Sequence, residues 1–125
     1  MKLMLGDDDI DDIELFHEAV REIKPDAELI ISNNGRQLLS KLQTEIPAVI
    51  FLDINMPEMN GWECLRFLKH DDGLKHIPVI MYTTSSAKRD IEIAKDMGAY
   101  KLVTKPDRFQ ELLTILSGIL REIGN

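Results

Sequence analysis

Cysteine is almost absent from this sequence of 125 residues. The only one is Cys64, which excludes a disulfide within the chain and a cysteine-rich zinc site. Glycine and proline are also scarce, with 7 and 5 residues, and the sequence contains no linker, internal repeat or low-complexity segment. We therefore expect residues 1–125 to form a single domain, since this length is typical of one domain.

Long hydrophobic runs are absent too. No stretch approaches the roughly 18 apolar residues of a membrane span, and the apolar start MKLML is too short for a signal peptide. Acidic residues outnumber basic ones, 22 to 15, and the formal net charge of −7 argues against a broad surface for nucleic acid or anionic membranes. These absences favour a soluble, cytoplasmic protein that binds neither DNA nor membranes directly.

The sequence does contain a regular alternation of two hydrophobic patterns. Helical spacing of apolar residues is found at 10–23, 38–42, 62–68, 91–97 and 109–123. Short strand-like segments precede these stretches, at 2–5, 27–32, 48–52, 78–82 and 100–103. The alternation predicts an α/β fold with a parallel sheet, helices on both faces and right-handed crossovers.

Polar residues follow four of the predicted strands. In an open parallel sheet, ligands bind outside the carboxyl ends of the strands. The residues expected there are acids, hydroxyls and a lysine: Asp7, Asp8 and Asp9, then Asp53, then Thr83 and Thr84, and finally Lys105.

This combination of residue types is suited to phosphoryl transfer. Carboxylates that converge on one point repel each other unless a cation joins them, and Mg²⁺ uses one or two carboxylates while keeping several waters. Asp7 and Asp8 with Asp53 therefore indicate a Mg²⁺ site. A carboxylate beside such an ion can act as a nucleophile toward phosphorus. Lys105 would supply positive charge and Thr83 a hydrogen-bond donor around the moving oxygens.

The acidic segment DDDIDD has a simpler interpretation as well. Acids at the start of a helix complement the helix dipole, and we favour this interpretation for Asp9, Asp11 and Asp12. For Asp7 and Asp8, which lie closest to the strand end, we favour metal binding.

A calcium-binding loop is a third interpretation of the acids, because Asp7, Asp9, Asp11 and Glu18 have the offsets of an EF-hand. It is excluded because Asp12 occupies the sixth position, where the loop needs glycine, and because helical periodicity continues through the segment.

Single residues outside the acidic segment are not diagnostic. Taken alone, Thr83 is a strand-end hydroxyl and Lys105 a surface lysine, while His17, His70 and His76 lack metal-like spacing. The hypothesis depends on the conjunction of the residues.

Four motifs together resemble response-regulator receiver domains: LGDDDIDD at 5–12, FLDINMPEMNG at 51–61, VIMYTTSS at 79–86 and VTKP at 103–106. Within that family, the DDxxDD start and HIPVIMYTTSS at 76–86 look most like single-domain regulators that partner phytochrome-type histidine kinases. The resemblance implies a flavodoxin-like (βα)5 fold with strand order 2-1-3-4-5 and no output domain.

The resemblance also implies a role for individual residues. Asp53 matches the phosphoacceptor, and Asp7 and Asp8 match the acidic pair that binds Mg²⁺, with Asp8 the more direct ligand. The backbone carbonyl of Asn55 matches the last protein ligand of the metal. Thr83 matches the hydroxyl that turns toward the phosphoryl group.

In the same family, the residue at Lys105 pairs with the phosphoryl group, and the peptide bond from it to Pro106 is expected to be cis. The family places a small residue at Thr84. The chain departs from the family pattern at Leu102, where an aromatic switch residue is usual, and at Asp107, where an apolar residue is common. Tyr100 lies near Leu102 in the sequence, but we do not assign it the role of the missing aromatic.

The function implied is that of a signalling switch rather than an enzyme. A sensor histidine kinase or a phosphotransfer protein would phosphorylate Asp53, and the change would alter binding of a downstream protein or formation of a homodimer. The expected surface comprises the fourth helix, fifth strand and fifth helix. Two alternatives stay open: a receiver-fold module that acts without phosphorylation, and an aspartate-nucleophile phosphatase suggested by DIN at 53–55, although Asn55 stands where that motif has aspartate.

Overall fold

The computed structural model describes residues 1–124 and contains five strands that alternate with five helices. The strands are β1 (Lys2–Gly6), β2 (Glu28–Ser32), β3 (Val49–Leu52), β4 (Val79–Thr83) and β5 (Lys101–Thr104). The helices are α1 (Ile10–Ile23), α2 (Gly35–Lys41), α3 (Gly61–His70), α4 (Lys88–Asp96) and α5 (Phe109–Gly124). The predicted α/β alternation is confirmed.

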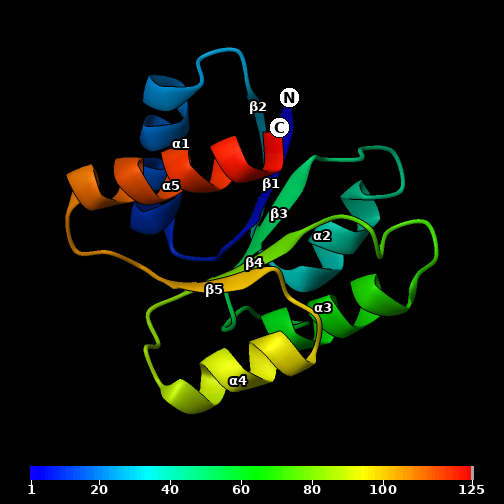
Figure 1. Cartoon of the computed structure of the whole chain (residues 1–125). Coiled ribbons are helices and arrows are strands. Elements are labelled where there is room, and N and C mark those ends of the chain that lie inside the picture. Colours follow the sequence, from blue (N-terminus) through cyan, green and yellow to red (C-terminus); the bar gives the residue numbers. More distant parts are fainter. Residues whose placement is uncertain (125) are drawn as a thin grey trace.

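All strand pairs are parallel, and the order in the sheet is β2-β1-β3-β4-β5 (Figure 1). The flavodoxin-like topology expected from the motifs is therefore confirmed. Helices α1 and α5 cover one face of the sheet, and α2, α3 and α4 cover the other. Parallel strands require such crossovers, because the chain leaves each strand at the carboxyl edge of the sheet and must return to the opposite edge before the next strand begins.

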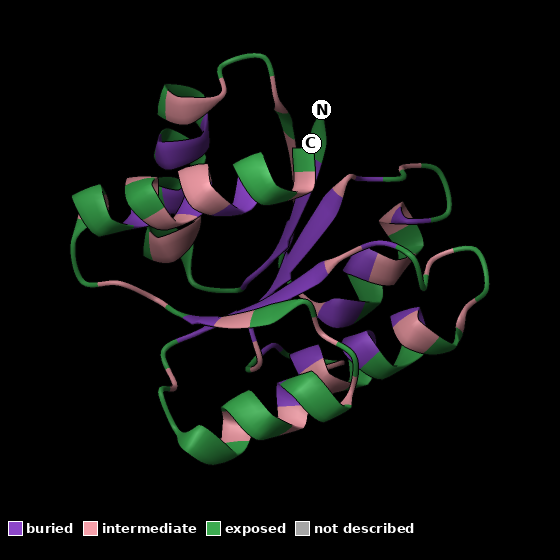
Figure 2. Cartoon of the chain, viewed as in Figure 1, coloured by how far each residue is buried: buried purple, intermediate pink, exposed green. Residues whose placement is uncertain are grey.

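The apolar runs of the sequence become the central strands. Every residue of β3 and β4 is buried, since helices cover both of their faces (Figure 2). In β1, Leu3 and Leu5 face α1 and α5, while Met4 faces the opposite helices. The edge strands β2 and β5 are less buried, with patterns that include exposed or half-buried residues.

An aromatic group fixes α1 on the sheet. The Phe16 ring lies edge-on to Phe51 of β3, with centroids 4.9 Å apart, and to Tyr82 of β4 at 5.4 Å. Edge-to-face pairs of this kind add about 0.5–1.5 kcal/mol beyond the area that they bury. The start of α1, which carries several acids, is thereby held against the carboxyl ends of the central strands.

Strand boundaries differ from the sequence prediction by one residue at several points. Thr83 belongs to β4, and Gly6 belongs to β1. Tyr100, which we expected to begin the fifth strand, precedes β5, although its N–H still donates to the Val79 carbonyl at 2.8 Å. In a parallel ladder the pairing register decides where a strand begins, and Lys101 is the first residue of β5 that pairs, opposite Ile80.

The start of α3 packs directly against the backbone that carries Asp53. An ideal Cβ at Gly61 would lie 2.2 Å from the carbonyl oxygen of Asp53 and 2.9 Å from Cα of Ile54. The Gly61 N–H also donates to the Ile54 carbonyl at 2.8 Å. Glycine is therefore required here by the close approach of two backbones.

Replacing Gly61 by alanine is expected to lower the free energy of unfolding by at least about 2 kcal/mol, because the clash is with backbone and no rotamer can relieve it. Gly118→Ala is the matched control, since its Cβ would meet nothing within 4 Å and it lies inside α5. That control should gain about 0.5–1 kcal/mol. Urea unfolding measures both changes, and equal stability of Gly61→Ala and the unsubstituted chain would contradict the close approach.

Candidate functional site

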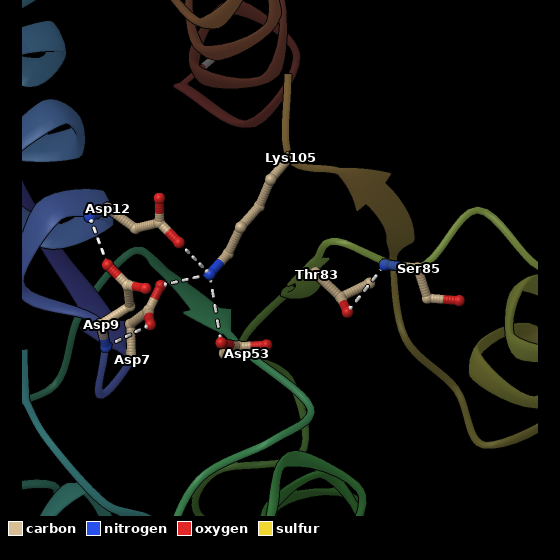
Figure 3. A network of polar contacts seen from close by, with 7 residues as sticks. All are labelled: Asp7, Asp9, Asp12, Asp53, Thr83, Ser85 and Lys105. Atoms are coloured by element: carbon tan, nitrogen blue, oxygen red, sulfur yellow. Dashed lines mark hydrogen bonds and ion pairs between the residues drawn. The ribbon is translucent and has the colours of Figure 1, made fainter. Parts of the chain in front are cut away.

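The polar residues predicted from the sequence meet at one edge of the sheet (Figure 3). Asp7 follows β1 and Asp53 follows β3, while Thr83 ends β4 and Lys105 follows β5. Backbone hydrogen bonds continue the ladder past the strand ends: the Asp53 N–H donates to Gly6 at 2.8 Å, and the Lys105 N–H donates to Thr83 at 2.6 Å. Each side chain is thus positioned by sheet backbone rather than by a free loop.

Three carboxylates converge at this edge. Asp7, Asp8 and Asp53 each offer one oxygen, and these oxygens all lie within 4.8 Å of one another. Asp7 is fully buried and Asp53 is 8% exposed, whereas Asp8 faces solvent. Among the described residues, no hydrogen bond reaches the buried oxygen Oδ2 of Asp7. A hard divalent cation fits this donor set, because such ions take carboxylate oxygens and tolerate an open, solvated side.

Lys105 reaches into the same cluster. Its Nζ lies 2.9 Å from Asp7 Oδ2 and 3.1 Å from Asp53 Oδ2, and its side chain is only 7% exposed. It also stands 5.4 Å from the centre of the Tyr82 ring, close enough for a cation–π contact. The lysine therefore provides a buried positive charge beside Asp53.

Burial and charge shift the pKa values of the groups in this site. Burial raises the pKa of Asp7 to about 6, although the close contact with the Lys105 ammonium and the hydrogen bond from the Asp9 N–H oppose the rise. Burial lowers the pKa of Lys105, but the hydrogen bond to Asp12, the close contact with Asp7 and the charge of Asp53 outweigh it, so the pKa lies well above its usual value. Burial also raises the pKa of Tyr82 to about 12. Lys105 is thus a permanent cation at neutral pH.

Sequence reasoning missed one participant. Asp9 lies at the start of α1, as expected, and as its N-cap it accepts the N–H of Asp12. Asp12 was expected only to complement the helix dipole, and that interpretation was incomplete. Its Oδ2 accepts a hydrogen bond from Lys105 at 2.8 Å. This bond joins the first turn of α1 to the residue after β5, across 93 positions of sequence. Local pattern in the sequence gives no signal for such a contact.

Thr83 lies at the centre of a second polar group. It is 1% exposed, and its hydroxyl accepts the N–H of Ser85 at 3.2 Å. The Ser85 hydroxyl donates to Asp90 of α4 at 2.6 Å, and the Ser85 carbonyl accepts the hydroxyl of Thr104 of β5 at 2.9 Å. Thr84, expected to be small and adjacent, is exposed. Ser85 therefore connects Thr83 to both α4 and β5.

Other predicted features lie away from these contacts. Asn55 is exposed in the turn after β3, two residues beyond Asp53. Leu102 is half-buried and packs against the apolar cluster on the α2, α3 and α4 side of the sheet. Tyr100 points to α5, where its hydroxyl donates to Glu122 at 3.2 Å, so it does not replace the aromatic residue missing at 102. Asp107 is exposed after β5.

One expectation was wrong. The peptide bond between Lys105 and Pro106 is trans in the structure, not cis. The trans form is the lower-energy isomer of such bonds by about 0.5–1 kcal/mol, so it is adopted unless the surroundings select the other.

The chain belongs to the response regulator receiver family of two-component signalling proteins. A profile of the response regulator receiver domain matches residues 4–117. The chain is 33% identical over 104 residues to the polar-differentiation response regulator DivK of Brucella anthropi, covering 83% of each protein. It is 30% identical over 124 residues to the response regulator Rcp1 of Synechocystis, covering 94% of this chain and 84% of that protein.

Solved structures agree with this membership. A crystal structure of the phosphorylated cyanobacterial phytochrome response regulator RcpA superposes with a TM-score of 0.88 at 30% identity, covering 96% of this chain and 91% of that one. The Mn²⁺-bound form of Rcp1 superposes with a TM-score of 0.85 at 29% identity, covering 95% and 91%. Phytochrome response regulators are thus among its close relatives. None of the helices within residues 1–124 has the length and apolar character needed to cross a bilayer.

The raised pKa of Asp7 predicts a specific pH dependence of stability. An unfolded aspartate has a pKa near 3.9, while the pKa of Asp7 is about 6 in the folded chain. The folded state therefore holds the proton more tightly between these values, and ionisation of Asp7 lowers stability as the pH rises from about 4 to 6. Without divalent cations, Asp7→Asn should be more stable than the unsubstituted chain at pH 7 by up to about 3 kcal/mol.

The measurement is urea unfolding at pH 4 and pH 7 in the presence of a chelator. The difference between Asp7→Asn and the unsubstituted chain should vanish near pH 4. Asp26→Asn, at an exposed acid after α1, controls for the change of net charge and should shift stability little at either pH. An Asp7→Asn variant that is no more stable at pH 7 would contradict the buried, charge-disfavouring environment.

Proposed function

We propose that this chain accepts a phosphoryl group on Asp53 and uses it to change the binding of a partner protein. The observation that carries the proposal is the position of Asp53. Its carboxylate directly follows the central strand β3, lies in a cluster with Asp7 and Asp8, and stands 3.1 Å from the buried ammonium of Lys105. A carboxylate in such surroundings can act as a nucleophile toward phosphorus while its neighbours balance charge.

We assign a Mg²⁺ site to the same cluster. Asp7, Asp8 and Asp53 would hold the ion together with the backbone carbonyl of Asn55, and the buried Oδ2 of Asp7 has a lone pair that no N–H of hydrogen-bond geometry uses. When bound, the ion would neutralise charge on the transferred phosphoryl oxygens. The Mn²⁺-bound form of Rcp1 supports a divalent cation in a relative of this fold.

The donor that fits is the phosphohistidine of a sensor histidine kinase or phosphotransfer protein, in the cytoplasm. An oxygen of Asp53 forms a bond to phosphorus while the bond from phosphorus to the imidazole nitrogen breaks. Lys105 approaches one phosphoryl oxygen, and the hydroxyl of Thr83 turns toward another. The product carries about −1.5 to −2 charges, which Lys105 partly balances.

The proposed switch passes through Ser85. When Thr83 turns toward the phosphoryl group, its hydroxyl leaves the Ser85 N–H, and the bonds of Ser85 to Asp90 and Thr104 change with it. Phosphorylation then biases an existing equilibrium of the loop before α4. The surface of α4, β5 and α5 would present this change to a downstream protein or to a second copy of the chain.

Phosphoryl uptake from acetyl phosphate tests the proposal directly. The unsubstituted chain should become phosphorylated only with Mg²⁺, and Asp53→Asn should abolish uptake because the nucleophile is lost. Asp26→Asn makes the same charge change at an exposed position and should leave uptake unchanged. A phosphate-affinity gel separates the two forms.

Three outcomes would contradict the proposal in different ways. Uptake that persists in Asp53→Asn would place the acceptor elsewhere. A chain that stays unmodified with acetyl phosphate and with a histidine kinase donor would be a module independent of phosphorylation. Repeated turnover of p-nitrophenyl phosphate would identify a phosphatase.

Ser85→Ala tests the switch. The variant removes the bond to Asp90 and the acceptor of the Ala87 N–H, and α4 otherwise begins without a side-chain cap. We expect uptake to persist, while the first turn of α4 loses about 1 kcal/mol of local stability by hydrogen exchange. Amide shifts of α4 on addition of beryllofluoride, an analogue of the phosphoryl group, should become smaller. Ser86→Ala is the exposed control, and shifts as large as those of the unsubstituted chain would exclude the Ser85 route.

A further inference from the structure

Lys105 contacts one carboxylate that the proposed reaction does not use. Its Nζ lies 2.8 Å from Asp12 Oδ2, closer than to Asp7 at 2.9 Å or to Asp53 at 3.1 Å (Figure 3). Asp12 comes from the first turn of α1, whereas the other two acids follow strands. It is not part of the group of carboxylates within 4.8 Å of one another. Its contact is therefore with the lysine rather than with a cation.

The hydrogen bonds of the ammonium are unevenly distributed. Lys105 donates to Asp12 at 2.8 Å and to Asp53 at 3.1 Å. Asp7 Oδ2 lies within ion-pair distance, yet no hydrogen bond from the described residues reaches it, although it is fully buried. An ammonium has three N–H donors. Its three N–H donors thus face three carboxylates, and the shortest of the three contacts is the one to Asp12.

We propose that Asp12 is a positioning residue for Lys105. By accepting one N–H, it draws the ammonium toward α1, so that Lys105 shares Asp7 Oδ2 with a divalent cation instead of occupying that oxygen alone. Without Asp12, the ammonium is held by Asp7 and Asp53 only, and it competes more strongly with the cation for Asp7 Oδ2. This inference rests on the proposed function, because it assigns the cation to Asp7, Asp8 and Asp53.

The local structure makes Asp12 suited to this role. Asp9 accepts the backbone N–H of Asp12 at 3.0 Å, so the helix N-cap fixes the backbone from which the carboxylate extends. The Asp12 side chain is 31% exposed, while that of Lys105 is 7% exposed. The pair thus joins the nearly buried ammonium of Lys105 to a partly exposed acid on α1.

Calorimetric titration with Mg²⁺ tests the inference without any phosphoryl donor. For Asp12→Asn we expect the dissociation constant of Mg²⁺ to rise about three- to tenfold, because the partly exposed, charge-assisted hydrogen bond to Lys105 becomes at most a weaker neutral one to the amide oxygen. Asp11→Asn is the matched control: it removes the same charge from the same helical turn, but Asp11 is exposed and makes no side-chain bond among the described residues. The Mg²⁺ dissociation constant of Asp11→Asn should stay within about twofold of that of the unsubstituted chain, since screening by salt weakens the effect of exposed charges.

A double-variant cycle separates positioning from direct attraction between Asp12 and the cation. If Asp12 acts through the lysine, then in the Lys105→Met background Asp12→Asn should leave the Mg²⁺ constant within about twofold. A rise of the same size in both backgrounds would show a direct charge effect and overturn the inference. An Asp12→Asn variant that binds Mg²⁺ as tightly as the unsubstituted chain, or an unsubstituted chain that does not bind Mg²⁺, would overturn it as well.

Phosphoryl uptake distinguishes this inference from the proposed function. In Asp12→Asn, the Mg²⁺ concentration for half-maximal uptake should rise as the dissociation constant does, while the rate at saturating Mg²⁺ approaches that of the unsubstituted chain. If the unsubstituted chain takes up no phosphoryl group but the calorimetric pattern holds, the proposed function fails and the role of Asp12 stands. If uptake depends on Asp53 but the calorimetric pattern is absent, the proposed function stands and the role of Asp12 fails.

Discussion

The contact of Lys105 with several carboxylates is the interaction on which this site depends. Two unit charges about 4 Å apart repel each other by about 4 kcal/mol at an effective dielectric constant of 20, and three carboxylates converge here with one of them fully buried. The ammonium of Lys105, held within 3.1 Å of Asp7, Asp12 and Asp53, offsets part of that repulsion. The fold can therefore keep the acids together without a metal, and Lys105 shares Asp7 Oδ2 with any cation that binds there.

The arrangement follows from the topology of the sheet more than from any single loop. Parallel pairing places the ends of β1, β3, β4 and β5 at one edge, and the central strands are buried on both faces, so their ends are rigid. The backbone approach at Gly61 fixes α3 against Asp53. The aromatic contacts of Phe16 fix α1, which supplies Asp12. The core thus sets the geometry of a site that is almost entirely polar.

The sequence was sufficient to predict the helices, the strands and the acids at the strand ends. Apolar runs and helical periodicity are local signals, and a parallel topology brings the carboxyl ends of the strands to one edge of the sheet. The sequence was not sufficient for Asp12, since a side-chain contact between α1 and the end of β5 depends on helix orientation, which no local pattern encodes. The start of β5 was misplaced at Tyr100 because the pairing register with β4 begins one residue later, at Lys101, and such a register is not encoded in local pattern either. The Lys105–Pro106 peptide was expected cis from family resemblance and is trans.

Position 102 holds leucine and not an aromatic residue, so the hydrogen bonds of Ser85 become the main candidates for transmitting a movement of Thr83. Leu102 packs into the apolar cluster and has no polar atom with which to follow a movement of Thr83. Ser85 instead joins the Thr83 hydroxyl to Asp90 and Thr104 by hydrogen bonds, which are directional and are lost over small displacements. Because the N-cap of α4 is Ala87, which has no side-chain cap, the Ser85 hydroxyl supplies the side-chain hydrogen bonds at the start of this helix, to the Ala87 N–H and to Asp90. In the proposed switch, a rotation of Thr83 therefore acts on α4 at its first turn, through Ser85.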